Sequence, residues 1–422
     1  MTSRRWDLGI VAGALALGAC GGREAAAPAT PTAAAAGPAA KGGAEPAKFD
    51  FEALLRREMP ALPMRKIAGE ILSAEVEASA EPKVVLEEKS FHVSVPLGGQ
   101  SPMECWVYEE SKDPAGTMGV MAASLRKNLD VKLFAPTDVF VAGEHAVLTT
   151  HAIYLADTPT GKGAGQIKLA FYNDPLAPSL CTHDEPGYSA SFARIAKHFF
   201  ETVQRRDRAL SGKPAKEWEV SVTKLDGKPV GFDEHRTYDH PETKLTTTVD
   251  VSATLYPRSV TESRSQDSIT TRTFDATGDL LELEYVSAAG GELEMKVTLK
   301  RLAAGRYSYG GEQAGKPITG KFQTNDKVGL ATDKRIAARI KNELLTGKAT
   351  SFKVEEYVAS IDPTAPLEST YEMESIEQRR VRASLGAIRM VTTVDAEGKA
   401  KGASANLGRA TLTIERIASG KR

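Results

Sequence analysis

The side chains best suited to metal chemistry are acidic residues and histidines that lie close together in the second half of the chain. They are Asp233, Glu234, His235, Asp239 and His240. Imidazole and carboxylate groups bind Zn²⁺, but a His-x4-His spacing in a stretch that reads as a loop matches no structural zinc motif. No free cysteine is available as a further ligand. The pattern favours a solvated polar turn, and we predict neither a metal nor a cofactor.

A glycine-rich stretch is the one candidate for phosphate binding. Residues Gly310–Pro317 follow the P-loop pattern until the last position, where Pro317 replaces the Ser or Thr that would bind Mg²⁺. The residues that follow alternate as in a strand, so no helix N-terminus is expected there to bind an anion. Gly-Lys-Pro also occurs at Gly212 and Gly227, which marks it as a recurrent turn in this chain. Nucleotide binding is therefore not predicted.

The sequence contains no recognisable catalytic nucleophile. It lacks both a Gly-x-Ser-x-Gly elbow and a His-Glu-x-x-His motif. His92, His145 and His151 are the histidines that could serve a convergent site, if one of them lay in a pocket beside a carboxylate with a perturbed pKa. We therefore expect a protein that is not an enzyme, and keep a hydrolase with an unrecognised site as the least favoured alternative.

The N-terminus has the layout of a secretory signal peptide. Arg4 and Arg5 precede the apolar stretch Leu8–Leu17, which is too short to span a bilayer. The next residues complete Leu17-Gly18-Ala19-Cys20, which resembles the lipobox of bacterial lipoproteins. The resemblance implies diacylglycerol on the sulfur of Cys20, cleavage before this residue, and usually a third acyl chain, such as palmitate, on the new amine.

Two or more acyl chains hold a protein stably on a membrane. In Gram-negative lipoproteins, an Asp after the lipidated cysteine tends to retain the protein at the inner membrane. Gly21 stands there in this chain. The resemblance thus implies the outer membrane, with the protein facing the periplasm rather than the cell surface. The alternatives are an ordinary signal peptide that is cut nearby and an uncleaved helix.

The charge balance and the cysteines narrow the range of partners and compartments. With 54 basic and 55 acidic residues and no basic block, the chain has no electrostatic footprint for nucleic acid. Cys105 and Cys181 remain as an even pair, and in an oxidising envelope we expect them to form a disulfide. The alternative is two buried free thiols. Closing this loop would stabilise the fold by roughly 4 kcal/mol in the chain-entropy model.

Composition divides the chain into five segments. We predict a signal peptide with its lipobox at 1–20, a disordered Ala/Pro/Gly tether at 21–48, a first domain at 49–208, a linker at 209–216 and a second domain at 217–422. The first domain reads as an α+β sandwich, with helices near 50–55, 118–129 and 189–203 around several strands. Ser189 is the expected N-cap of the last helix. The order of elements is similar to the layout of PsbP-like and Mog1-like proteins.

The second domain reads as an antiparallel β-meander, because alternating strands recur between turns that contain glycine. One main helix, Asp333–Leu345, interrupts it, with Thr332 or Asp333 as cap and Gly347 as stop. The pattern of Lys296–Gly305 matches that of Thr411–Gly420. This match indicates a weak internal repeat, unless two alternating strands have merely converged.

One helix cannot cover so long a meander, so the sheet must curl into a half-barrel or pack on the first domain. A curled sheet with a helix across its mouth is similar to LolA/LolB-type lipoprotein carriers. Our first hypothesis is an outer-membrane lipoprotein that binds an apolar or protein ligand on the concave face of this sheet, with the helix Asp333–Leu345 as a lid. The second hypothesis is a structural or assembly partner of envelope machinery.

Overall fold

The computed structural model describes residues 51–422 except 89, 100, 109–128, 159–160, 175–176, 206–213, 258–262 and 327–328. The lipobox with Cys20, the tether and the helix expected at 118–129 lie outside these residues. Strands account for 61% of the structure and helices for 9%. The chain is thus nearly all-β, and the prediction of an α+β sandwich followed by a meander with one main helix was wrong. Within the described part, no helix has the length and apolar character that crossing a bilayer requires.

Within 51–205, the residues that the structure describes form two antiparallel sheets and two helices. The three-stranded sheet has the order β1 (Met64–Ala68), β2 (Leu72–Glu77), β10 (Gln204–Arg205). The seven-stranded sheet has the order β3 (Lys83–Leu86), β4 (Ser90–Val95), β5 (Met103–Tyr108), β9 (Ser179–Asp184), β8 (Gly161–Tyr172), β7 (His145–Thr158), β6 (Asp130–Ala142). The helices are α2 (Phe51–Leu55) and α4 (Ser189–Thr202).

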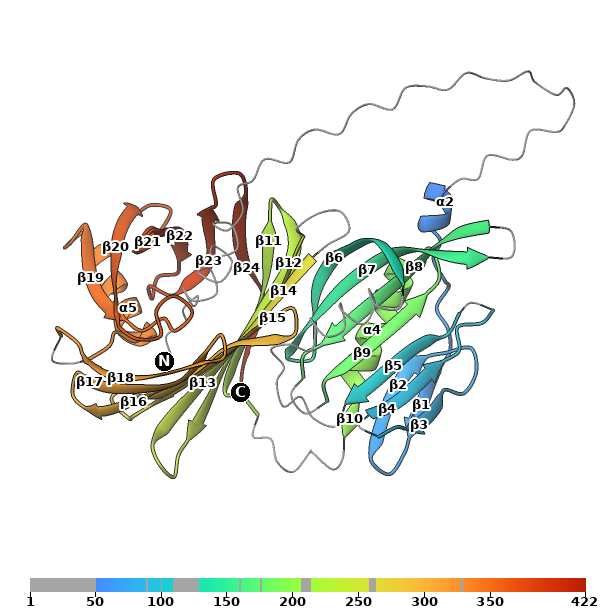
Figure 1. Cartoon of the computed structure of the whole chain (residues 1–422), viewed down its shortest axis with the longest axis horizontal. Coiled ribbons are helices and arrows are strands. Elements are labelled where there is room, and N and C mark those ends of the chain that lie inside the picture. Colours follow the sequence, from blue (N-terminus) through green and yellow to red (C-terminus); the bar gives the residue numbers. More distant parts are fainter. Residues whose placement is uncertain are drawn as a thin grey trace, which may run out of the picture.

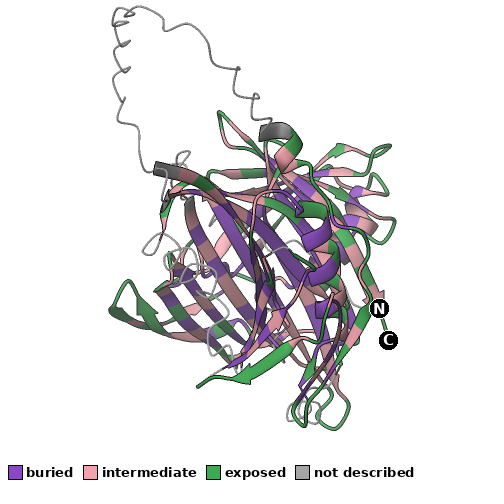
Figure 2. Cartoon of the chain, turned by 90° about the vertical axis from the view of Figure 1, so that its right-hand side faces the viewer, coloured by how far each residue is buried: buried purple, intermediate pink, exposed green. Residues whose placement is uncertain are grey.

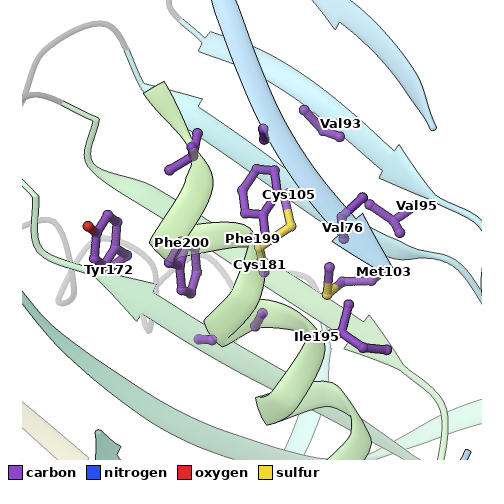
Figure 3. Close-up of a cluster of buried hydrophobic side chains, with 14 of the residues drawn as sticks. Val76, Val93, Val95, Met103, Cys105, Tyr172, Cys181, Ile195, Phe199 and Phe200 are labelled. Carbon is purple, nitrogen blue, oxygen red and sulfur yellow. A yellow bond between two sulfur atoms is a disulfide. The ribbon is translucent and has the colours of Figure 1, made fainter. Parts of the chain in front are cut away.

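Helix α4 packs against β2 of the three-stranded sheet and against the seven-stranded sheet, and this packing makes the core of the first domain (Figure 3). Ile195, Phe199 and Phe200 lie in the helix expected near 189–203, and all three are fully buried against the strands. The predicted disulfide between Cys105 and Cys181 is present in this core, and it joins directly paired positions of β5 and β9. It therefore links two strands that adjoin in the sheet but lie 76 residues apart in the sequence.

The start of α4 differs from the sequence prediction. The N-cap is Tyr188, which has φ 60° and makes no side-chain cap hydrogen bond, rather than Ser189. The carboxylate of Glu58 accepts hydrogen bonds from the backbone N–H groups of Ala190 (3.0 Å) and Ser191 (2.7 Å). A negative charge at a helix N-terminus also interacts favourably with the helix dipole. A residue distant in sequence thus caps this helix.

Residues 217–421 form a single antiparallel sheet that curls around its own concave face (Figure 1). Its order is β18 (Lys316–Gln323), β17 (Arg306–Gln313), β16 (Glu292–Ala303), β15 (Leu280–Ala289), β14 (Ser263–Phe274), β13 (Leu245–Pro257), β12 (Lys228–His240), β11 (Glu217–Leu225), β24 (Thr411–Lys421), β23 (Ala400–Asn406), β22 (Ile388–Val394), β21 (Arg380–Leu385), β20 (Leu367–Ser375), β19 (Ser351–Glu356).

The chain passes from β18 to β19 through α5 (Asp333–Arg339), which continues as the π-helix η1 (Ile340–Leu344). Ile336, Ile340 and Leu344 recur at helical spacing, are buried on one side of this helical segment, and pack against strands β19 to β22. The concave face at β19 to β22 is therefore filled by side chains of the chain itself.

The central strands of this sheet, β11 to β13, bury their convex face against the first domain. Val220, Phe232 and Leu255 share one core with Leu148 and Phe171 of the seven-stranded sheet. Figure 2 shows buried residues running through the middle of the molecule. Because side chains alternate between the faces of a strand, the opposite face of β11 to β13 points into the curl. That face is polar, as in Asp250 and Thr237.

The two halves of the predicted repeat have matching turns. Asp275, after β14, accepts hydrogen bonds from the backbone of Thr277 and Asp279, and Asp395, after β22, accepts them from Glu397 and Lys399. Each turn is followed by two antiparallel strands, β15–β16 and β23–β24. The repeat itself stays a prediction, with the same turn chemistry in both halves.

Candidate ligand-binding site

A cavity of about 460 Å³ opens where β12 and β14 end and β13 begins, beside the start of α5. This size falls in the range of small-molecule sites, roughly 300–1,000 Å³. The lining residues come from four places along the chain: 216, 237–248, 274–278 and 332–334. They are Lys216, Thr237, Asp239, His240, Pro241, Lys244, Leu245, Thr246, Thr248, Phe274, Asp275, Ala276, Gly278, Thr332, Asp333 and Lys334.

Two lysines that line the cavity form no ion pair with any described residue. Lys244 lies in the turn between β12 and β13, and Lys334 lies in the first turn of α5. Both are exposed and form no ion pair within the part of the chain that the structure describes. In contrast, Lys216 is paired with Asp239. The rim thus presents two cationic groups to a ligand.

One of the acidic residues that line the cavity, Asp275, is already engaged. Asp275 Oδ1 accepts hydrogen bonds from its own turn, and its Oδ2 lies 3.4 Å from the guanidinium of Arg301. Burial would raise the pKa of Asp275, but these hydrogen bonds and the charge of Arg301 lower it on balance. Asp275 is therefore a carboxylate whose charge is largely compensated, and it does not cancel the charge of the rim lysines.

The wall of the cavity combines apolar side chains with one buried hydroxyl that lacks a partner. Leu245 and Phe274 are half-buried and supply apolar surface. Thr332 is 6% exposed, and its Oγ1 has no hydrogen-bond partner among the described residues. A buried polar group without a partner costs free energy. Thr332 is thus ready to bond a polar atom of a ligand in the cavity.

A buried charge network lies directly behind this wall. Asp250 and Arg272 line a small adjoining cavity that shares Phe274 and Thr332 with the large one. His235 Nδ1 donates to Asp250 Oδ1 at 2.6 Å, and Arg272 pairs with the other oxygen of Asp250. Because the side chains come from three neighbouring strands, the network fixes their polar face.

The pKa values of this network follow from competing effects. Burial would lower the pKa of His235, but the charge and hydrogen bond of Asp250 outweigh burial and raise it. Burial would raise the pKa of Asp250, but His235 and Arg272 lower it on balance. The interactions therefore favour the charged forms of both groups, so the interior beside the cavity is polar.

The five residues considered for metal binding lie on strand β12, not in a loop. His235 points into the curl, where it contacts Asp250, whereas Glu234 faces the first domain. Asp239 is paired with Lys216, and His240 Nε2 lies 3.1 Å from Thr247 Oγ1. In the described ranges, no three His, Cys, Asp or Glu side chains are grouped as metal ligands. The expectation of a loop was wrong because both faces of this strand carry charges.

Glu234 instead joins the two domains. Its Oε1 accepts a hydrogen bond from the backbone N–H of Ala146 at 2.5 Å, and its Oε2 accepts one from Asn173 at 3.0 Å. The guanidinium of Arg236 lies 2.5 Å from Oε2, and His145 Nδ1 lies 3.9 Å from it. Burial would raise the pKa of Glu234, but Arg236 and His145 lower it on balance. His145 thus belongs to a structural cluster between the domains.

The other two histidines considered for catalysis also lie away from the cavity. His92 stacks on Trp106 with ring centroids 4.9 Å apart, and its Nε2 lies 2.8 Å from Glu104 Oε2. Burial and the charge of Lys168 lower the pKa of His151. The structure therefore does not bring His92, His145 and His151 together in one site.

The P-loop-like stretch is a hairpin between β17 and β18. Ala314 and Gly315 form its turn with φ values of 49° and 73°. A strand follows this turn, in agreement with the sequence reading of Ile318 and its neighbours. No phosphate cradle at a helix N-terminus exists there.

No protein-family model matches the chain, and no curated protein matches it. Among solved structures, the chain is similar to a β-barrel-like protein of the domain of unknown function DUF1849 from Brucella abortus. The identity is 14% over 50% of this chain and 99% of that one, with a TM-score of 0.39. A DUF1089 family protein from Pseudomonas aeruginosa matches with 12% identity over 46% of this chain and 91% of that one, with a TM-score of 0.20. Similarity at this level assigns the chain to no family.

Proposed function

We propose that this chain is a non-enzymatic, lipid-anchored protein of the bacterial outer membrane that binds a small amphipathic anion between β12–β14 and α5. The observation that carries the proposal is the cavity of about 460 Å³, with Phe274 in its wall and two lysines at its rim that form no ion pair with a described residue. Such a combination suits a ligand with an anionic head and an apolar body, because small-molecule sites pair apolar walls with a few placed polar groups.

The positions of the two lysines support an anionic head group. Lys244 belongs to the β12–β13 hairpin and Lys334 to α5, so an anion between them is held by two elements far apart in the sequence. The hydroxyl of Thr332 can donate a further hydrogen bond to the same group. A hydrogen bond to a charged group contributes about 1.5–3 kcal/mol.

The apolar part of the ligand is limited by the polar concave face. Side chains of α5 and η1 already cover the concave face at β19 to β22, and the face of β11 to β13 that points inward is polar. Apolar surface remains at Leu245 and Phe274 in the mouth. The ligand is therefore amphipathic rather than wholly apolar, and α5 forms a fixed wall of the site in place of the expected lid.

The membrane anchor in this proposal is the lipidated Cys20, followed by the tether 21–48. A flexible chain of this length has an r.m.s. reach of roughly 30 Å, which would hold the folded part clear of the bilayer. Metabolic labelling with palmitate and fractionation test the anchor. The mature chain should be labelled and membrane-bound, and Cys20→Ser should abolish both properties. Labelling that persists in this variant would refute the anchor.

Binding is tested with 1-anilinonaphthalene-8-sulfonate, an amphipathic anion that fluoresces in apolar surroundings. The full chain carrying Cys20→Ser provides a soluble background. Lys244→Ala with Lys334→Ala should weaken binding about 10-fold or more, the equivalent of about 1.4 kcal/mol. The control, Lys316→Ala with Lys321→Ala on the edge strand β18, should leave it unchanged.

A second variant tests whether the probe occupies the cavity. Thr248→Trp places a large ring among the lining residues and should abolish binding without changing the circular dichroism spectrum. Equal affinity in the rim variant and in its control would refute the proposed site.

A further inference from the structure

Strand β3 forms an edge of the seven-stranded sheet and exposes apolar side chains. Its one partner in the described structure is β4, and its other edge is free of any described strand. Val84, Val85 and Leu86 are 42%, 55% and 63% exposed. By comparison, the edge strand β18 carries lysines and a proline, which discourage pairing with other chains. Figure 1 places β3 at the outer end of the first domain, far from α5.

The backbone of β3 presents unused hydrogen-bonding groups along that free edge. The N–H of Glu87 donates to the C=O of Ser90 in β4 at 2.8 Å. In antiparallel pairs, the residues that exchange hydrogen bonds alternate along a strand. Glu87, Val85 and Lys83 therefore direct their backbone groups toward β4, while Val84 and Leu86 direct theirs outward. The free edge thus offers two donors and two acceptors, two residues apart.

We propose that two copies of this chain associate by antiparallel pairing of their β3 strands around a two-fold axis at Val85. In this register, Val84 of one copy lies opposite Leu86 of the other, and each such pair exchanges two backbone hydrogen bonds. Val85 lies opposite Val85 of the second copy. Lys83 lies opposite Glu87 of the second copy, and opposite charges in directly opposed positions stabilise a strand pair.

The neighbouring registers are less favourable. A shift that pairs Val84 with itself places Leu86 opposite Pro82, which has no N–H to donate. A shift that pairs Leu86 with itself places Val85 opposite Glu87, so an apolar side chain faces a charge. The register centred on Val85 alone of the three satisfies the outward backbone groups, the apolar side chains and the charges together.

The side chain of Glu87 remains available for this contact. It lies 3.5 Å from His92 Nδ1 and is still 45% exposed. The dimer would join two seven-stranded sheets into one continuous sheet. Because the contact is distant from the cavity, self-association and the proposed ligand binding can be tested independently, and failure of one does not refute the other.

Engineered cysteines test the register directly. In the full chain with Cys20→Ser, the two remaining cysteines are joined in the disulfide. Val85→Cys places two thiols opposite each other with Cα atoms about 4.5 Å apart, which a disulfide can bridge. Leu86→Cys is the matched control, since Leu86 is more exposed but lies opposite Val84. Mild oxidation should cross-link the Val85→Cys variant at least 10-fold faster.

Cross-linking at equal rates, or faster at position 86 as exposure alone would dictate, would overturn the proposal. Sedimentation equilibrium then tests the charges in the chain without engineered cysteines. Lys83→Glu should weaken the dimer, and Lys83→Glu combined with Glu87→Lys should restore it. A chain that stays monomeric at about 1 mM, or that pairs only with a foreign extended peptide, also contradicts self-association.

Discussion

Replacing Glu234 by leucine should weaken the contact between the two domains more than any exposed substitution. The side chain of Glu234 is 0% exposed, and that of its partner Arg236 is 4% exposed. Leucine leaves the buried guanidinium without its carboxylate. It also removes the acceptor for the backbone N–H of Ala146 and for the amide of Asn173.

The expected decrease in the free energy of unfolding follows from these lost interactions. Breaking a buried ion pair by removing one partner costs about 3–5 kcal/mol. Each hydrogen bond lost to Ala146 and Asn173 adds about 1 kcal/mol. We therefore expect Glu234→Leu to reduce the free energy of unfolding by about 5–7 kcal/mol. With a urea dependence of about 3 kcal/mol/M, the unfolding midpoint should fall by about 2 M.

Urea unfolding followed by tryptophan fluorescence is the suitable assay, because Trp106 and Trp218 pack against the core between the domains. Glu415→Leu serves as a control. Glu415 forms an ion pair with Lys224 at 2.5 Å, but its side chain is 53% exposed. Loss of such a pair should cost less than about 1 kcal/mol.

The double variant Glu234→Leu with Arg236→Met distinguishes a stranded charge from general damage to packing. Replacing a whole buried ion pair by apolar side chains is often neutral, so the double variant should regain at least about 2 kcal/mol. No recovery, or a cost of less than about 1 kcal/mol for Glu234→Leu alone, would refute the reasoning.

The pH dependence gives a second readout. The pKa of Glu234 is lowered from its usual 4.5, so its contribution to stability is present above pH 4.5 and is lost as the pH falls through the folded-state pKa. The leucine variant should lack this part of the acid dependence.

Two further substitutions test other parts of the fold. Burial holds the pKa of His183 at about 4, below its usual 6.5. The unfolded chain therefore binds the proton first, and stability should fall by about 3 kcal/mol between pH 6.5 and pH 4. Between these two pH values, the free energy of unfolding of the His183→Phe variant, measured with urea, should fall by correspondingly less than that of the unchanged chain. The same pH dependence in both would contradict the argument. Gly398 has φ 75°, and a Cβ there would lie 2.3 Å from the carbonyl oxygen of Ala337 in α5. Gly398→Ala should lower the unfolding midpoint by the equivalent of about 2 kcal/mol or more. Gly386→Ala, with φ 57° and open space around the position, should cost only about 1 kcal/mol; equal costs would rule out the clash.

Local periodicity predicted those elements whose two sides differ in polarity. The period-two pattern of 281–285 matches strand β15, where Leu283 and Tyr285 are buried. The spacing of Ile336, Ile340 and Leu344 correctly identified the buried side of the helical segment after β18. In both elements, one face contacts water or polar groups and the other face packs in a core. A periodic pattern of apolar residues predicts secondary structure only when the two faces differ in this way.

The same reasoning failed where both faces of an element are buried by partners distant in the sequence. Strand β12 has Glu234 on the face toward the first domain and His235 on the face inside the curl, so its sequence resembles a polar loop. The N-terminus of α4 is capped by Glu58, which no local motif reveals. Both features depend on tertiary contacts that a single-sequence pattern does not contain.

The candidate site was missed for a related reason. Lys244, Phe274 and Lys334 come together only because the sheet curls and α5 crosses back to the ends of β12 to β14. Neither their types nor their spacing forms a motif. Thr332 was noticed as a helix cap, and its sequence gives no sign that its hydroxyl would be buried without a partner.

The convex surface of β11 to β13 has a consequence for how this protein can be divided. Cutting the chain at 206–213 would release a fragment whose Val220, Phe232 and Leu255 lose their cover and meet water. An apolar surface of this kind drives aggregation. The segment 206–213 thus separates two sets of sheets, but neither half is expected to be stable without the other. The two halves should unfold together as one cooperative unit.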